Sequence, residues 1–197
     1  MRYGVSVETF ELEILDFESH QGFLEKLPAP ISGVVLCVGY LGYQNDAIGD
    51  ASEAFKILNT NFLGPINFLN EVANYFEKRK TGFIVVISSV AGDRGRASNY
   101  FYGAAKSGLT TYLSGIRNRL FKSGVHVLTV KPGFVDTKMT RKLELPKGLT
   151  SEPIEAAEII YRAIKNKKDV IYVKGRWRFI MLIVRLLPEG IFKRLNL

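Results

Sequence analysis

Residues 83–106 read FIVVISSVAGDRGRASNYFYGAAK, and this stretch decides the fold. It begins with an apolar run of the length of one strand, and two serines follow where that strand should end. From Ser98 to Lys122 the pattern is helical, and this helix carries Tyr102 and Lys106 four residues apart. We therefore expect a strand, a polar loop and a long helix in succession.

The same alternation extends in both directions along the chain. Further strands are expected at Phe10–Ile14, Ile31–Val38, Val125–Val130 and Val170–Val173, and further helices at Ala51–Lys78, with a kink at Pro65, and at Pro153–Ile164. The first strand alternates apolar with acidic residues, which predicts a half-exposed strand, whereas the second is continuously apolar, as in a strand buried on both faces. The pattern predicts an α/β fold with a parallel sheet covered by helices on both faces.

Composition is that of an ordinary globular protein. The chain has 197 residues, 47% hydrophobic, and its single cysteine, Cys37, lies inside an apolar run. A lone cysteine there predicts a buried thiol in a reducing compartment, most simply the cytoplasm. The first residues form no apolar segment, so no secretory signal is expected.

The net charge of +8 comes from one end of the chain. Residues 1–161 hold 17 basic and 17 acidic residues, whereas residues 162–197 hold 10 basic and 2 acidic ones. A neutral body argues against a nucleic-acid binder, and the apolar residues of the basic end are mostly aliphatic rather than stacking aromatics. The charge therefore indicates a tail with its own partner.

Polar residues and glycines suited to chemistry follow the expected strands, where ligands bind in parallel sheets. A tyrosine titrates near 10, so it needs a cation nearby to act as an acid or base at neutral pH. Lys106, one helical turn from Tyr102, could lower the pKa of that phenol. Taken singly, the residues are equally consistent with a capping serine, a surface Tyr/Lys pair and an asparagine at a kink.

Four motifs in order resemble the short-chain dehydrogenase/reductase family: Asn61-x-x-Gly64, a serine at a strand end, Tyr-x-x-x-Lys, and a Pro-Gly loop with a threonine. Tyr102 follows Ser89 by 13 residues, the separation that the family uses. Tyr161 and Lys165 have the same spacing but no serine-bearing strand before them. The resemblance covers most of the chain and implies a Rossmann-like, doubly wound sheet.

The resemblance also implies roles. Tyr102 would be the general acid or base, Ser89 would hold the substrate oxygen, Lys106 would bind the nicotinamide ribose, and Asn61 would hold a water that passes protons to Lys106. The implied cofactor is NADP or NAD, and no metal is expected. Besides Tyr102 and Lys106, the implied cofactor-binding residues are Asp16, Gly39, Pro132, Gly133, Val135 and Thr137.

Two departures from the family pattern stand out. Leu36-Cys37-Val38-Gly39 replaces the usual Asn-Asn-Ala-Gly, and no Gly-rich turn precedes Val5. A first β-α-β-α portion, on the order of 50 residues, is therefore expected to be absent. Its loss would leave a gap of roughly 14 Å between the Phe10 and Ile31 strands. We interpret the chain as a truncated reductase that binds dinucleotide poorly.

Residues 174–197 form a basic apolar tail beyond the expected domain of residues 1–173. The apolar run after Arg178 is too short to span a bilayer. It fits a helix lying on an anionic membrane surface, with Trp177 at the headgroup level, on the inner face of a membrane. The alternative is a C-terminal helix packed on its own domain or on a dimer mate.

These observations favour an NAD(P)-dependent oxidoreductase that reduces a ketone, or oxidises a secondary alcohol, on a small-molecule or lipid-linked substrate. The stretch Gly39–Gly42 and the tail around Pro188 resemble the branch that reduces decaprenylphosphoryl 2-keto-pentose. The alternative is a non-catalytic, membrane-associated remnant of the same fold. The resemblance also implies that the two long helices could pair across a homodimer.

Overall fold

A four-stranded parallel sheet forms the centre of the computed structural model, which describes residues 4–28, 30–141 and 144–195. Its strands, in spatial order, are β1 (Gly33–Leu36), β2 (Phe83–Ile87), β3 (His126–Pro132) and β6 (Val170–Val173). A separate parallel pair joins β4 (Phe134–Val135) to β5 (Thr150–Ser151). The α/β architecture expected from the sequence is confirmed.

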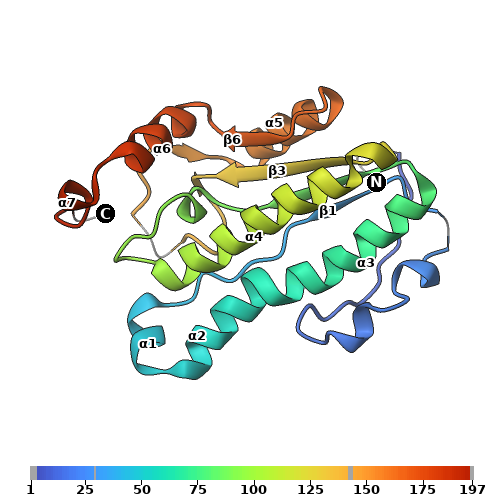
Figure 1. Cartoon of the computed structure of the whole chain (residues 1–197), viewed down its shortest axis with the longest axis horizontal. Helices are drawn as coiled ribbons and strands as arrows, with labels where there is room; N and C mark the ends of the chain where they lie inside the picture. The colour runs from blue at the N-terminus through green and yellow to red at the C-terminus, as the bar shows by residue number, and fades with distance from the viewer. Residues whose placement is uncertain (1–3, 29, 142–143, 196–197) are drawn as a thin grey trace.

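Helices cover both faces of the sheet (Figure 1). The α-helices are α1 (Gln44–Gly49), α2 (Ala51–Leu58), α3 (Gly64–Arg79), α4 (Tyr100–Leu120), α5 (Pro153–Lys165), α6 (Arg176–Leu186) and α7 (Glu189–Phe192). Short 3₁₀ turns lie at Glu18–His20 (η1), Leu24–Lys26 (η2), Val90–Gly92 (η4) and Phe121–Ser123 (η5).

Alternate residues of β2 divide the core into two halves. Ile84 and Val86 face a cluster with α3 and α4, whereas Val85 faces a cluster with α5. All three side chains are almost completely buried. The two-sided burial is what a parallel sheet requires, and it fixes the strand ends relative to the helices.

Local signals explain the helix ends. Asp50 accepts a hydrogen bond from the Ser52 backbone N–H at 2.8 Å and so caps α2. Helix α3 ends where Lys80 adopts a left-handed conformation, with φ of 54°. Gly82, at φ of 131°, packs so closely against Phe76 that an added Cβ would lie 2.3 Å from that ring.

The long helix expected from Ala51 to Lys78 changes its hydrogen-bond pattern partway along, just before Pro65. A π-helical turn, Asn59–Leu63, separates α2 from α3, and Pro65, which has no N–H to bond within the helix, follows directly at the start of α3. Such π turns are often found at functional sites. This one carries Asn61.

The strand expected at Phe10–Ile14 is wrong. The segment lies beside α3, with the Ile14 carbonyl against Gly64, and Leu12 and Ile14 join the core cluster of that face. Alternating apolar residues indicate only that one side of an extended segment is covered, and here a helix covers it. Residues 10–14 form no strand of the sheet. The gap expected between this segment and the next strand is therefore not found among the described residues.

Strand β1 is an edge strand within the described residues, and this corrects two expectations. Leu36 is buried, but Val35 is 50% exposed and Cys37 is also exposed. The apolar run is therefore covered on one face rather than on both, and the cysteine is not a buried thiol.

Among the described residues, no helix combines the length and apolarity that crossing a bilayer requires.

Candidate active site

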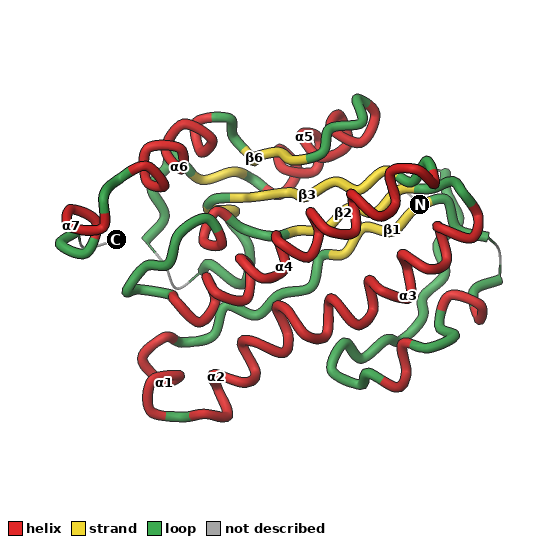
Figure 2. Tube along the Cα trace, in the orientation of Figure 1, coloured by secondary structure: helices red, strands yellow, loops and turns green. Residues whose placement is uncertain are grey.

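Four residues singled out from the sequence follow the carboxyl ends of strands or lie on the helices beside them. Helices α1 and α6 lie at this end of the sheet (Figure 2). Ser89 follows β2 directly, Tyr102 and Lys106 lie near the start of α4, and Asn61 lies in the π turn. Hydrogen bonds from Ser88 Oγ to the Lys106 carbonyl (3.1 Å) and with Thr110 Oγ1 (2.7 Å) join the end of β2 to α4.

Lys106 is 2% exposed and reaches across the strand ends. Its Nζ donates to the Ile87 carbonyl at 3.1 Å and approaches the Val38 carbonyl at 3.5 Å. The same nitrogen lies 5.7 Å from the centre of the Tyr102 ring. Burial lowers the pKa of Lys106 to about 8.

Burial raises the pKa of the Tyr102 phenol to about 12, and the neighbouring Ser89 hydroxyl, which acts to lower that pKa, offsets this only in part. The expectation that Lys106 makes the phenol more acidic is therefore wrong for this structure. The ammonium is itself destabilised by burial and is directed at backbone carbonyls. A more acidic phenol requires a further group near these side chains.

Asn61 is completely buried, and both the oxygen and the nitrogen of its amide are hydrogen-bonded. Its Oδ1 accepts from the Tyr40 N–H at 3.1 Å, and its Nδ2 donates to the carbonyls of Tyr40 and Ile57. Gly39 lies between Asn61 and Lys106: an added Cβ would be 3.3 Å from Asn61 Oδ1 and 3.6 Å from Lys106 Nζ. A glycine there keeps open the space beside the ammonium.

The Pro-Gly loop follows β3 at the same end of the sheet. Gly133 packs directly under the Trp177 indole, where an added Cβ would lie 1.9 Å from the ring. Val135 pairs with Ser151, and its carbonyl accepts from Thr140 Oγ1, which also accepts from the Thr137 N–H. The loop is thus fixed partly by α6, which the sequence did not indicate.

Asp16 is not brought to this site. It lies in the turn before η1, where its carboxylate and its carbonyl bond with Ser19. It lines a shallow groove formed by residues 10–26, which contains none of the other candidates. The adenine-binding role implied for Asp16 has no support in this arrangement.

Sequence reasoning missed how α4 is capped. Asn99 is its N-cap residue, yet the Asn99 side chain makes no capping bond. Gln44 of α1 does so instead, with Oε1 accepting from the Phe101 N–H at 3.2 Å. A cap from a distant helix leaves no local pattern in the sequence, because the capping residue is 57 positions away along the chain.

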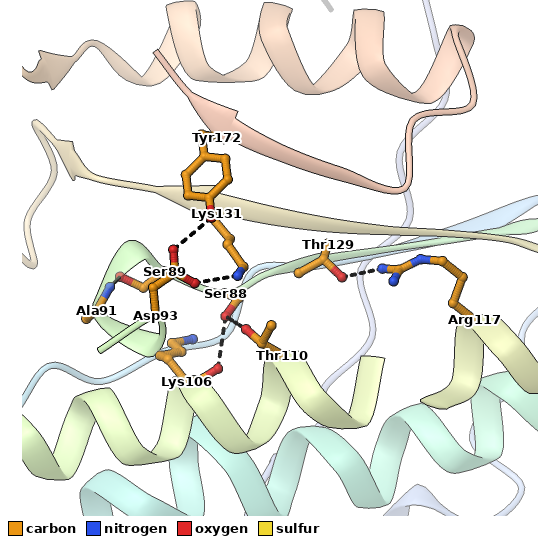
Figure 3. Close-up of polar contacts among 10 residues, drawn as sticks. All are labelled: Ser88, Ser89, Ala91, Asp93, Lys106, Thr110, Arg117, Thr129, Lys131 and Tyr172. Carbon is orange, nitrogen blue, oxygen red and sulfur yellow. Dashed lines mark hydrogen bonds and ion pairs between the residues drawn. The ribbon is translucent and has the colours of Figure 1, made fainter. Parts of the chain in front are cut away.

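A buried polar cluster beside Ser89 was also missed (Figure 3). Lys131 Nζ lies 2.5 Å from Asp93 Oδ1, and the Tyr172 hydroxyl donates to Asp93 Oδ2 at 2.8 Å. The Lys131 and Asp93 side chains are 9% and 3% exposed. A lysine inside an apolar strand was the available signal, because buried lysines are almost always paired.

Comparisons with known proteins agree with this geometry. Residues 2–147 match the family described as short chain dehydrogenase. An uncharacterised oxidoreductase of Mycobacterium tuberculosis is 35% identical over 98% of this chain and 78% of its own length. The 3-oxoacyl-[acyl-carrier-protein] reductase MabA of Mycobacterium avium is 32% identical over 90% of this chain and 66% of its own length.

A crystal structure of a short chain dehydrogenase from Burkholderia cenocepacia, in complex with NADP, shares the fold with a TM-score of 0.81. The two sequences are 20% identical, and the match spans 95% of this chain and 77% of the Burkholderia protein. The family match extends over most of the chain and includes Asn61, Ser89, Tyr102 and Lys106. The chain therefore belongs to the short-chain dehydrogenase family, whose members are NAD(P)-dependent oxidoreductases.

Proposed function

We propose that this protein reduces a ketone, or oxidises the corresponding secondary alcohol, on a hydrophobic or lipid-linked substrate that can carry a sugar. The observation that carries the proposal is the meeting of Ser89, Tyr102, Lys106 and Asn61 at one end of the sheet. The structurally analogous protein from Burkholderia cenocepacia binds NADP, and the similar MabA is named for reducing a 3-oxoacyl group.

The residues present fit the nicotinamide side of such a cofactor. Gly39 leaves space beside the Lys106 ammonium, and Pro132 and Gly133 end a strand at the same edge of the sheet. Lys106 would hold the ribose, and Pro132, Gly133, Val135 and Thr137 would form the loop along the nicotinamide. The bound cofactor would supply or accept the hydride.

The chain's own side chains would manage the proton. Ser89 donates a hydrogen bond to the substrate oxygen, and Tyr102 gives that oxygen its proton during reduction. The high pKa of the buried phenol keeps it protonated and ready to donate at neutral pH. Lys106, with Asn61 beyond Gly39, would return a proton to Tyr102 after each turnover.

Turnover of a graded set of ketones tests the proposal. We expect loss of reduced coenzyme with long-chain ketones, a weaker response with short ones, and none with Ser89→Ala. Absence of turnover with every ketone, in a chain that is folded by circular dichroism, would favour the non-catalytic remnant. We do not favour that alternative, because all four proton-handling residues are present and grouped.

We further propose that the outer face of α6 contacts an anionic lipid surface. Phe179, Leu182, Ile183 and Leu186 are 55–72% exposed on this helix, and Arg178 is exposed beside them. Arg176 and Arg185, on the same helix, are also exposed and add positive charge that suits an anionic surface. Trp177 is not part of it, because it is 5% exposed and packs on Gly133.

Vesicle binding distinguishes this face from ordinary surface apolar residues. Phe179→Ser with Leu182→Ser should abolish sedimentation with phosphatidylglycerol vesicles, whereas Phe121→Ser, at an 80% exposed site elsewhere, should not. Binding should weaken with salt and be absent with phosphatidylcholine alone. Wild-type protein that ignores both vesicle types would overturn the lipid proposal.

A further inference from the structure

The four residues after Ser89 connect the site to distant parts of the chain. Ser89 begins the 3₁₀ turn η4, with its Oγ accepting from the Ala91 N–H and its carbonyl accepting from the Gly92 N–H. Asp93 follows at once and is bound by Lys131 and Tyr172 (Figure 3). One short turn therefore separates the proposed substrate-binding hydroxyl from a buried ion pair.

Arg94 extends this connection to the C-terminal helices. Its Nη1 donates to the carbonyls of Val184 at 2.5 Å and Leu187 at 2.6 Å, and its Nη2 pairs with Glu189 Oε2 at 2.8 Å. The guanidinium also lies 3.7 Å from the centre of the Phe192 ring. A single side chain thus contacts the end of α6, the turn beyond it and α7.

Pro188 explains why the end of α6 lacks a backbone donor that Arg94 can replace. Within a helix the Val184 carbonyl would accept from the residue four positions later, but that residue is Pro188, which has no N–H. Arg94 supplies the missing donor, and its positive charge suits the negative end of the α6 dipole. The planar fork of arginine presents donors from two nitrogens to two carbonyls and a carboxylate, whereas lysine has all of its donors on one nitrogen.

Apolar contacts support the same link. Val90, in η4, shares a buried cluster with Trp177 and Met181 of α6. Trp177 in turn covers Gly133 of the Pro-Gly loop. Helix α6 therefore contacts both the segment that follows Ser89 and the loop proposed to meet the nicotinamide.

We propose that Arg94 is a positioning residue of the active site: by fixing α6 and α7 to residues 90–94, it holds Ser89 in place beside Tyr102. This rests on the proposed function for its catalytic consequence. The structural claim of the proposal, that the C-terminal helices restrain residues 88–94, does not depend on the proposed function. A shift of about 1 Å in a substrate-orienting group can cost on the order of 100-fold in rate.

Arg94→Met, compared with wild type and with Arg119→Met, tests the inference. Arg119 is a fair control, because it binds Asn74 and Glu77 across two helices away from the site. We expect Arg94→Met to lower kcat about 10-fold or more, with KM for the ketone nearly unchanged. Arg94→Lys should recover part of the loss, and Arg119→Met should remain within about two-fold of wild type.

Hydrogen exchange gives a second measurement that needs no turnover. Arg94→Met should speed exchange about 10-fold or more in peptides covering residues 88–94 as well as 176–192. Faster exchange confined to 176–192, or equal loss of kcat in the Arg119→Met control, would overturn the inference. If wild type turns over no ketone, the proposed function falls, while exchange at 88–94 still decides the restraint.

Discussion

Lys106 Nζ lies 5.7 Å from the centre of the Tyr102 ring, yet it donates to the backbone at Ile87 rather than to the phenol. The two side chains are neighbours without being a direct pair. Burial acts on both in opposite directions, raising the pKa of the tyrosine to about 12 and lowering that of the lysine to about 8. Transfer of a proton from the Lys106 ammonium to a Tyr102 phenolate is therefore favourable, whereas their ordinary pKa values would make it nearly neutral.

Removing the phenol should abolish activity without unfolding the protein. We expect Tyr102→Phe to lower kcat by about 100-fold to 10,000-fold, the usual contribution of a general acid. Tyr161→Phe is the matched control, because Tyr161 also has a lysine four residues on, with Lys165 Nζ 5.3 Å from its ring centre, but is 59% exposed. Steady-state rates and thermal melts of both variants check this, and equal losses would contradict it.

The buried lysine should make stability depend on pH. Lys106 has a pKa of about 8 when folded and 10.5 when unfolded, so the unfolded chain binds more protons between these values. Stability should therefore rise from pH 8 toward 10, by about 2 kcal/mol from this group. Above pH 10 the trend should reverse, because Tyr102 loses its proton near 10 when unfolded and near 12 when folded.

Urea melts at pH 7.5 and 9.5 measure this effect, because the two values lie below and above the folded pKa of about 8. Lys106→Met keeps the side-chain length and has no charge to bury. The variant should lack the rise between the two pH values that wild type shows. An identical rise in both proteins would mean that other groups cause it.

Asn61 should contribute to stability as well as to proton transfer. Asn61→Leu keeps the branched outline of the side chain but leaves the Tyr40 N–H and carbonyl without their buried partner. We expect the free energy of unfolding to fall by about 2 kcal/mol or more. Asn70→Leu, at an exposed position of α3, should change it by less than about 0.5 kcal/mol. Chemical denaturation of the two variants decides the matter.

The Asp93–Lys131 pair should show strong coupling. Asp93→Leu leaves a buried ammonium and Lys131→Met a buried carboxylate, so each should cost about 3–5 kcal/mol. The double variant removes both charges and should be clearly more stable than the sum of the two losses implies. Additive losses in this cycle would show that the pair does not act as a unit.

The parts of the fold that the sequence predicts are those governed by local pattern. Strand β6 was predicted at Val170–Val173 and is found there, and Phe83–Ile87 is equally well placed. The order and spacing of Ser89, Tyr102 and Lys106 predicted that they lie together as a candidate site, because strand ends in a parallel sheet meet at one edge. The four proposed proton-handling residues come from this reasoning.

What the sequence left open depends on which surface covers a segment. Leu12 and Ile14 alternate as in a strand but pack on a helix, and Cys37 lies in an apolar run that is covered on one side only. In the sequence, Trp177 suits a membrane interface as well as a protein core. In the structure, its indole packs on a glycine of a distant loop. Periodicity shows that one side of a segment is covered, but only the tertiary structure shows which element covers it.

The contact between Trp177 and Gly133 gives the protein an optical reporter of its own. Trp177 is the only tryptophan in the chain, and its indole rests on the loop proposed to meet the nicotinamide. Emission from this one fluorophore should therefore change when that loop moves or when a reduced coenzyme, which absorbs in the same region, is bound beside it. Ligand binding could then be followed in unlabelled protein, without any substrate in hand.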